Sequence, residues 1–303
     1  MSVLGSLSPS RAADFMSCPL LYRFRVVDKL VEAPSPAAVR GTVVHAVLEA
    51  LFDLPAAERT PQAALDLLGP HWERVLTDEP ELAALFEGDD ATDVVSWLAE
   101  CRSLLGTYFR LEDPTRLEPA RREMYVEHVL DSRLLLRGYV DRVDVNASGA
   151  MRVVDYKTGR SPSEMFEGKA LFQMRFYALV LWRSTGRVPD LLQLVYLGNG
   201  EVLRYEPDER DLLATERKVN ALWTAIARAH ETGRWEPHRS ALCDWCDHRA
   251  LCPVWGGTPP PLPEAPDPGE VQPEVGAPVA GAGARCAPLR SGSVSSAGSL
   301  GVI

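Results

Sequence analysis

Two acid-bearing segments in the middle of the chain have residue types that could do metal chemistry. Residues 138–144 read GYVDRVD and residues 153–159 read VVDYKTG. Both segments are apolar and strand-like up to the acid. Because successive side chains of a strand point to opposite faces, we expect Asp155 and Lys157 on one face and Tyr156 on the other.

A hairpin through residues 146–149 would bring Asp141 beside Asp155. Two carboxylates and one ammonium group at a sheet edge suit a hard cation with oxygen ligands, with Lys157 directed at a polarised water or a phosphate. The same spacing also fits a solvated, salt-bridged hairpin. The hairpin alone therefore leaves both interpretations open.

Two amphipathic segments flank this hairpin, and each reads as a helix. Residues 40–49 place apolar side chains around His45, with Glu49 one turn later on the same face. Gln173 and Tyr177 are four residues apart on one face of the second segment. Taken alone, His45 also fits a core histidine, and the second pair fits an ordinary helix surface with a core tyrosine.

The candidate residues follow one another in a fixed order: His45, Asp141, Asp155, Lys157, Gln173 and Tyr177. In this order and in these local contexts the chain resembles the RecB-type branch of the PD-(D/E)xK nuclease superfamily. Its motifs are a helix histidine, an acid after a Gly-x-(Ile/Val)-Asp strand, an Asp-x-Lys strand and a Gln-x-x-x-Tyr helix. The resemblance covers about residues 8–255.

The resemblance implies an α/β fold with a restriction-endonuclease-like mixed sheet core flanked by helices. It also implies Mg²⁺ or Mn²⁺ held by three side chains and one backbone carbonyl: His45, Asp141, Asp155 and Tyr156. Lys157 would orient or help deprotonate the attacking water. Gln173 and Tyr177 would hold Lys157 or a substrate phosphate.

Clustered cysteines form a second pattern: Cys18 near the amino terminus, then Cys243, Cys246 and Cys252. The first residues show no secretory signal, and clustered cysteines in an intracellular enzyme favour metal binding over disulfides. Four thiolates could hold zinc or an iron–sulfur cluster, and the spacing does not decide between them. Cys101 reads as a core residue, and Cys286 lies in a tail.

The family resemblance favours the iron–sulfur alternative. AddB-type subunits and CRISPR-associated RecB-like exonucleases carry one early and three late cysteines around a [4Fe–4S] centre, and Pro253 follows the last cysteine as it does there. The resemblance thus implies that all four cysteines bind one cluster. Such ligands would join both ends of the domain and add to its folding free energy.

Around these motifs, Ser8 and Pro9 predict the start of a first helix that carries Cys18. Apolar patterns predict strands and long helices in this order: strands at 123–130, 134–145 and 151–157, the Gln173 helix, strands at 191–197 and 201–205, and a helix at 209–232. We expect a nuclease domain over residues 1–255, with a helical insertion at about 53–118 and a cluster segment at 235–255. The Pro-, Gly- and Ser-rich residues 256–303 are expected to be disordered.

Composition limits the class of protein. The chain has 303 residues, 46% of them hydrophobic, and a net charge of −10. It has no run of about 18 apolar residues that could span a bilayer, so we expect no membrane partner and a cytoplasmic location. The negative charge argues weakly against nucleic acid, but arginines such as Arg122, Arg142 and Arg175 lie near the motifs, although most would form ordinary ion pairs. No P-loop sequence is present.

These observations predict a metal-dependent deoxyribonuclease, an exonuclease in DNA repair or recombination, acting on single-stranded DNA or DNA ends. A helicase on another chain is a possible partner. The alternative is a catalytically weak DNA-binding or scaffold subunit of a helicase–nuclease complex. A zinc-bound structural module is a third interpretation. The presence of Asp141, Asp155 and Lys157 together favours the enzyme.

Overall fold

A mixed six-stranded sheet forms the centre of the protein. The computed structural model describes residues 5–88, 91–162 and 167–263. Within them the strand order is β1-β3-β4-β5-β6, and β2 pairs with β3. The β1–β3 and β4–β5 pairs are parallel and the others antiparallel. The strands are β1 (Gly5–Leu7), β2 (Pro119–Val129), β3 (Leu134–Val145), β4 (Met151–Lys157), β5 (Leu191–Tyr196) and β6 (Glu201–Tyr205).

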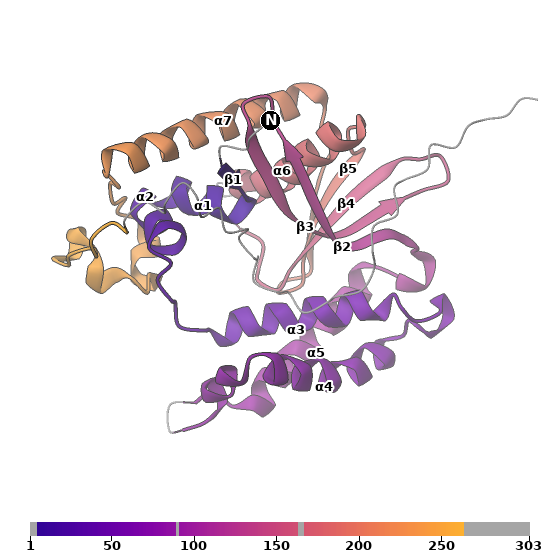
Figure 1. Ribbon diagram of the computed structural model, residues 1–303. Helices are drawn as coiled ribbons and strands as arrows, with labels where there is room; N and C mark the ends of the chain where they lie inside the picture. The colour runs from indigo at the N-terminus through magenta and orange to yellow at the C-terminus, as the bar shows by residue number, and fades with distance from the viewer. Residues whose placement is uncertain (1–4, 89–90, 163–166, 264–303) are drawn as a thin grey trace, which may run out of the picture. The chain divides into compact units, whose positions relative to one another are not determined.

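Long helices cover both faces of this sheet (Figure 1). One layer contains α1 (Pro9–Ser17), α6 (Glu167–Thr185) and α7 (Glu209–Thr232), and the other contains α3 (Pro36–Leu51), α4 (Pro61–Asp78) and α5 (Val94–Leu111). Shorter helical segments join them: α2 (Pro19–Tyr22), the π-helical η1 (Arg23–Val27), η2 (Ala56–Glu58), η3 (Pro80–Phe86), η4 (Pro114–Arg116), η6 (Ala241–Trp245), η7 (Arg249–Leu251) and η8 (Pro253–Trp255).

Alternating side chains of the central strands supply both cores. Val153 is buried with the α1, α6 and α7 layer, whereas Val154 and Tyr156 are buried with the α3, α4 and α5 layer. This two-residue alternation is the one expected for a strand. Asp155 therefore lies on the α6 side of the sheet, opposite Tyr156.

The first helix begins as predicted and ends earlier than predicted. The Ser8 side chain accepts a hydrogen bond from the Arg11 amide, and Pro9 occupies the first helical position. Cys18 is extended (φ −163°, ψ 115°) and lies between α1 and α2 instead of within the first helix. The reason is Pro19, because a residue that precedes proline is disfavoured in helical geometry.

The observed fold confirms the expected class, a mixed sheet flanked by helices. The described residues between 53 and 118 are largely helical, as expected, but their role as an insertion and the domain limits remain predictions. The sequence did not predict β1, since three residues are too few to show a period. Residues 264–303, with most of the predicted disordered tail and Cys286, lie outside the described residues. None of the described helices is long and apolar enough to cross a membrane.

Candidate functional site

The first element of the site is the place where β3 and β4 separate. Their regular pairing reaches Arg142 and Val154. Just beyond, the Tyr156 amide donates a 2.7 Å hydrogen bond to Oδ2 of Asp141. The Asp141 carboxylate thus takes the place of a backbone acceptor, which fixes its orientation at the sheet edge.

A glycine allows α6 to approach the same strand closely. A Cβ atom on Gly138 would lie only 2.7 Å from Cε1 of Tyr177. Any larger residue would therefore displace the Tyr177 ring or α6, which also carries Gln173. This contact gives a packing reason for glycine three residues before Asp141.

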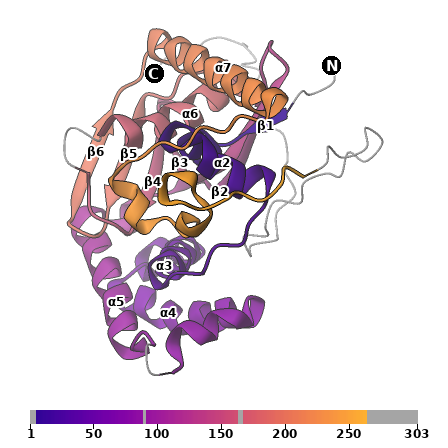
Figure 2. The ribbon, with the colours of Figure 1, turned by 90° about the vertical axis from the view of Figure 1, so that its left-hand side faces the viewer.

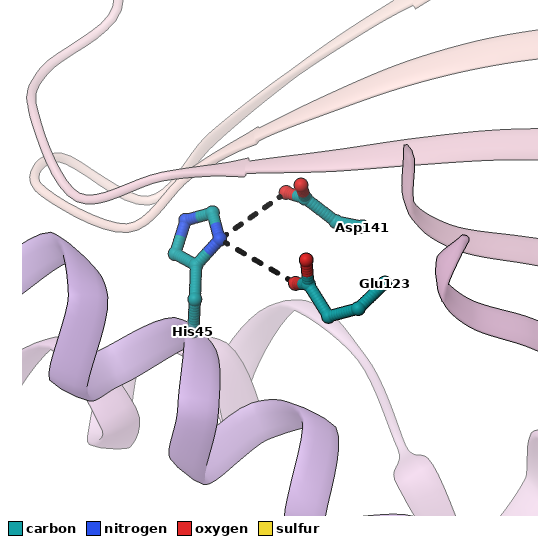
Figure 3. A group of neighbouring side chains, drawn as sticks. All are labelled: His45, Glu123 and Asp141. Atoms are coloured by element: carbon teal, nitrogen blue, oxygen red, sulfur yellow. Dashed lines mark ion pairs between the residues drawn. The ribbon is translucent and has the colours of Figure 1, made fainter. Parts of the chain in front are cut away.

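His45 on α3 reaches the edge from the other helical layer. Its Nε2 lies 3.0 Å from the Tyr156 carbonyl oxygen. Because a carbonyl only accepts, Nε2 must carry the hydrogen. Nδ1 then faces two carboxylates, with Oδ2 of Asp141 at 3.5 Å and Oε1 of Glu123 at 4.0 Å (Figure 3).

Glu123 on β2 is a site residue that the sequence did not reveal. One ligand atom from each of His45, Glu123 and Asp141 lies within 4.8 Å of the others. Glu123 has φ 40°, a conformation that side-chain-bearing residues rarely adopt, between the pairs Arg122–Arg142 and Met124–Val140. An acid after two arginines reads as a solvated strand end, so its sequence context held no signal.

Negative charge is crowded at this edge. Burial, and then the charge of Asp141, raises the pKa of Glu123 to about 8. Burial, and then the charge of Asp155, raises the pKa of Asp141 to about 6, against the opposing effect of His45. Neighbouring carboxylates repel one another when ionised, and a cation placed among them stabilises their ionised forms. The donor set, one imidazole nitrogen and carboxylate oxygens, fits Mg²⁺ or Mn²⁺.

Asp155, Lys157 and Gln173 form a closed triangle of polar contacts. Nζ of Lys157 lies 2.7 Å from Oδ2 of Asp155 and donates to Oε1 of Gln173 at 2.9 Å. Nε2 of Gln173 donates to Oδ1 of Asp155 at 3.1 Å. Asp155 is 2% exposed, whereas 31% of the Lys157 side chain remains exposed. The ammonium group is therefore oriented and still open to solvent.

Tyr177 lies behind this triangle. Its hydroxyl is 3.4 Å from Nε2 of Gln173, and the ring is buried. Burial raises the pKa of Tyr177, so the hydroxyl stays neutral. The tyrosine contacts Gln173, and through it can influence Lys157.

The side chain of Arg142, next to Asp141, is engaged in contacts within the fold. Its side chain is 1% exposed and pairs with Glu112 at 2.8 Å and Asp144 at 3.1 Å, and it donates a hydrogen bond to the Tyr156 hydroxyl. For this arginine the expectation of an ordinary ion pair is met. It braces the strand residues beside the site.

Four cysteines line one cavity that is partly open to solvent: Cys18, Cys243, Cys246 and Cys252. The C-terminal described segment folds back beside α1 and α2 (Figure 2). The His238 amide lies 3.3 Å from Sγ of Cys18, and the Ser240 amide 3.4 Å from Sγ of Cys243. Cys101 is buried in the core of the α3–α5 layer, away from this cavity.

The sulfurs are spread out within the cavity. In the described part of the chain, His45, Glu123 and Asp141 make up the group of metal-binding side chains within 4.8 Å of one another, and no three cysteines do so. Zn–S bonds of about 2.3 Å would place tetrahedral sulfurs about 3.8 Å apart. The observed spacing is wider than a single zinc ion requires.

Known proteins match this sequence and this fold. Residues 6–253 match the PD-(D/E)XK nuclease superfamily, and the chain belongs to it. Gene 69 protein of Mycobacterium phage D29 is 28% identical over 276 residues, 82% of this chain and 96% of the phage protein. A Eubacterium rectale crystal structure, of a protein provisionally named an exonuclease, has a TM-score of 0.54 at 14% identity over 82% of this chain and 89% of that one. At that identity the structural likeness concerns the fold.

Proposed function

We propose that this chain is a metal-dependent exonuclease that hydrolyses phosphodiester bonds of DNA, acting on single strands or DNA ends. The observation that carries the proposal is His45 Nδ1 facing Asp141 and Glu123 beside the oriented Lys157. Membership of a nuclease superfamily and the provisional name of the Eubacterium rectale protein support it. A role in repair or recombination, alongside a helicase on another chain, is part of the same proposal.

The cation would be held by His45, Asp141, Asp155 and the Tyr156 carbonyl. Glu123 lies within 4.8 Å of His45 and Asp141 and adds a carboxylate on the β2 side, whereas Asp155 lies outside that group and contacts Lys157 and Gln173. The Tyr156 carbonyl bonds to Nε2 of His45, on the ring edge away from Nδ1 and the acids, so the His45 ring would turn for both groups to bind one cation. When bound, Mg²⁺ or Mn²⁺ supplies Lewis-acid stabilisation of phosphate charge and increases the acidity of an attacking water.

Lys157 would act on the attacking water and on the charge of the phosphate. Its Nζ, held by Asp155 and Gln173, would orient the attacking water and stabilise charge that develops on the phosphate oxygens. Gln173 would position Lys157, and Tyr177 would position Gln173. The exposed side of the ammonium group leaves room for substrate.

The direct test is cleavage of end-labelled single-stranded DNA with Mn²⁺ by anaerobically purified protein. We expect activity in the wild type and none with Asp155→Ala. Lys157→Ala should lose turnover by roughly 10²–10³-fold but still bind Mn²⁺ in a calorimetric titration, and Lys157→Arg should not restore it. Near-wild-type cleavage by Asp155→Ala would refute the assignment. DNA binding without cleavage by the wild type would favour the scaffold alternative.

We also propose that Cys18, Cys243, Cys246 and Cys252 bind one [4Fe–4S] cluster. Their shared cavity and the amide groups directed at two of the sulfurs support this. Burial raises the pKa of the Cys246 thiol, so a metal centre would be needed to hold it as thiolate. Anaerobic protein should show a broad visible absorption band and contain iron. Colourless protein containing stoichiometric zinc would refute the cluster.

A further inference from the structure

Two tyrosines stand exposed beside the candidate cation site. Tyr125 on β2 and Tyr139 on β3 are direct cross-strand partners, with ring centroids 5.2 Å apart. They are 44% and 48% exposed. Neighbouring aromatic rings left open on a sheet face are unusual and suggest a binding surface.

The sheet geometry directs this pair to the face away from α6. Gly138 and Val140, the neighbours of Tyr139, lie against Tyr177 or within the α6 core. Because side chains alternate along a strand, Tyr139 points to the opposite face, as does its cross-strand partner Tyr125.

The pair also lies next to the ligand residues. Tyr139 is two residues before Asp141, and Tyr125 is two residues after Glu123. Two residues of a strand span about 6.6 Å. A nucleotide whose phosphate met the cation site would have its neighbour's base within reach of these rings.

We propose that Tyr125 and Tyr139 form a stacking platform for an unpaired nucleobase adjacent to the scissile phosphate. This inference rests on the proposed nuclease function and deepens it by assigning a single-stranded substrate. An aromatic ring stacks on any base, because every base has a π face, whereas bases within a duplex have theirs covered. An uncharged platform also suits a site whose own acids repel phosphate until a cation binds.

The test measures binding of fluorescein-labelled oligothymidylate to the full chain in Ca²⁺ by anisotropy. Tyr125→Ala and Tyr139→Ala should each weaken binding about tenfold, within the range for loss of one stacked base. Tyr125→Phe and Tyr139→Phe should bind as the wild type. Val129→Ala, at an exposed position of β2 four residues from Tyr125, is the matched control and should change nothing. Wild-type binding by both alanine variants would overturn the platform.

A second measurement does not depend on the folding of any variant. An abasic position moved along the oligonucleotide should weaken wild-type binding about tenfold at one position near the cleaved end. Binding by Tyr139→Ala should not be weakened further by an abasic residue at that position. If wild-type protein cleaves DNA but no position is sensitive, the platform is wrong and the nuclease function stands. If wild-type protein neither binds nor cleaves DNA, both are wrong.

Discussion

Metal-binding side chains lie together in two regions: the sheet edge around Asp141 and Asp155, called the cation edge below, and the cysteine cavity. Different interactions hold the side chains in place in the two regions. At the edge, Asp141 is fixed by a backbone amide, and Asp155 by Lys157 and Gln173. These residues come from long strands and helices whose apolar sides fill the two cores. The edge is therefore formed by the fold itself.

The cysteine cavity has weaker support from the chain. Cys243 lies in the short 3₁₀ helix η6, and Cys246 and Cys252 are the residues that end η6 and η7. None of η6, η7 and η8 contains a buried residue. Contacts at the borders tie the segment down, such as the Tyr22–Trp235 stack and the His248–Glu32 pair at 3.0 Å. A segment with so little core of its own would gain most of its stability from what the sulfurs bind.

The largest expected effect comes from removing a charge at the edge without removing its hydrogen bond. Asp141→Asn can still accept from the Tyr156 amide, yet it should lose DNA cleavage by on the order of 10³-fold. Its thermal stability should be kept or raised, because one of several crowded carboxylates is gone. Asp131→Asn, an exposed acid in the turn of the same hairpin, is the control for both measurements.

If the edge depended on its bound cation, as we propose that the cavity depends on its cluster, Asp141→Asn would lower the melting temperature as well as the activity. That outcome would contradict a preformed edge.

The cavity should respond in the opposite sense. Cys246→Ser is expected to lose the bound iron and to lower the melting temperature by several degrees, since ligation across the domain contributes folding free energy. Cleavage should fall as a consequence of instability. Cys101→Ala, outside the cavity, should keep its iron. A cluster-free Cys246→Ser protein that melts like the wild type would show that the segment is held without its ligand.

The site could be predicted where its chemistry follows local spacing. Asp155 and Lys157 share a strand face two residues apart, and Gln173 and Tyr177 share a helix face, so periodicity alone places each pair. The α/β class follows from the same strand and helix periods. These features depend on the nearest few residues, which the sequence displays directly.

Features that depend on distant contacts could not be predicted in this way. Glu123 enters the site only through the register of β2 on β3 and a left-handed backbone. The exposure of Tyr125 and Tyr139 depends on which face of the hairpin α6 covers. Cys18 is different, because Pro19 carried a local signal against a continuous helix that the prediction of helix one left unused.

A smaller effect should appear with pH. Both acids have raised pKa values, so between their unfolded values and about 6 for Asp141 or about 8 for Glu123 the folded state holds more protons than the unfolded state. In metal-free protein these two acids should therefore contribute most to stability below this range, and their contribution should be lost as pH rises through it. Mn²⁺ should raise the melting temperature more above pH 8 than at pH 6.

Glu123→Gln should remove the upper part of that pH dependence and leave the lower part. If metal-free wild-type protein became more stable between pH 6 and pH 8, the crowding of carboxylates at the edge would be wrong.

The smallest effects on turnover are expected for Gln173, which contacts Lys157, and for Tyr177, which contacts Gln173. Gln173→Ala removes an acceptor of Lys157 and a donor to Asp155, and should lower turnover about tenfold, as loss of an outer ligand partner does. Tyr177→Phe removes only the long contact to Gln173 and should cost roughly threefold or less. Because both changes act on Lys157, the double variant should be little worse than Gln173→Ala. Turnover of the four proteins on one labelled DNA gives the comparison, and multiplicative losses would mean that Tyr177 acts on substrate independently of Gln173.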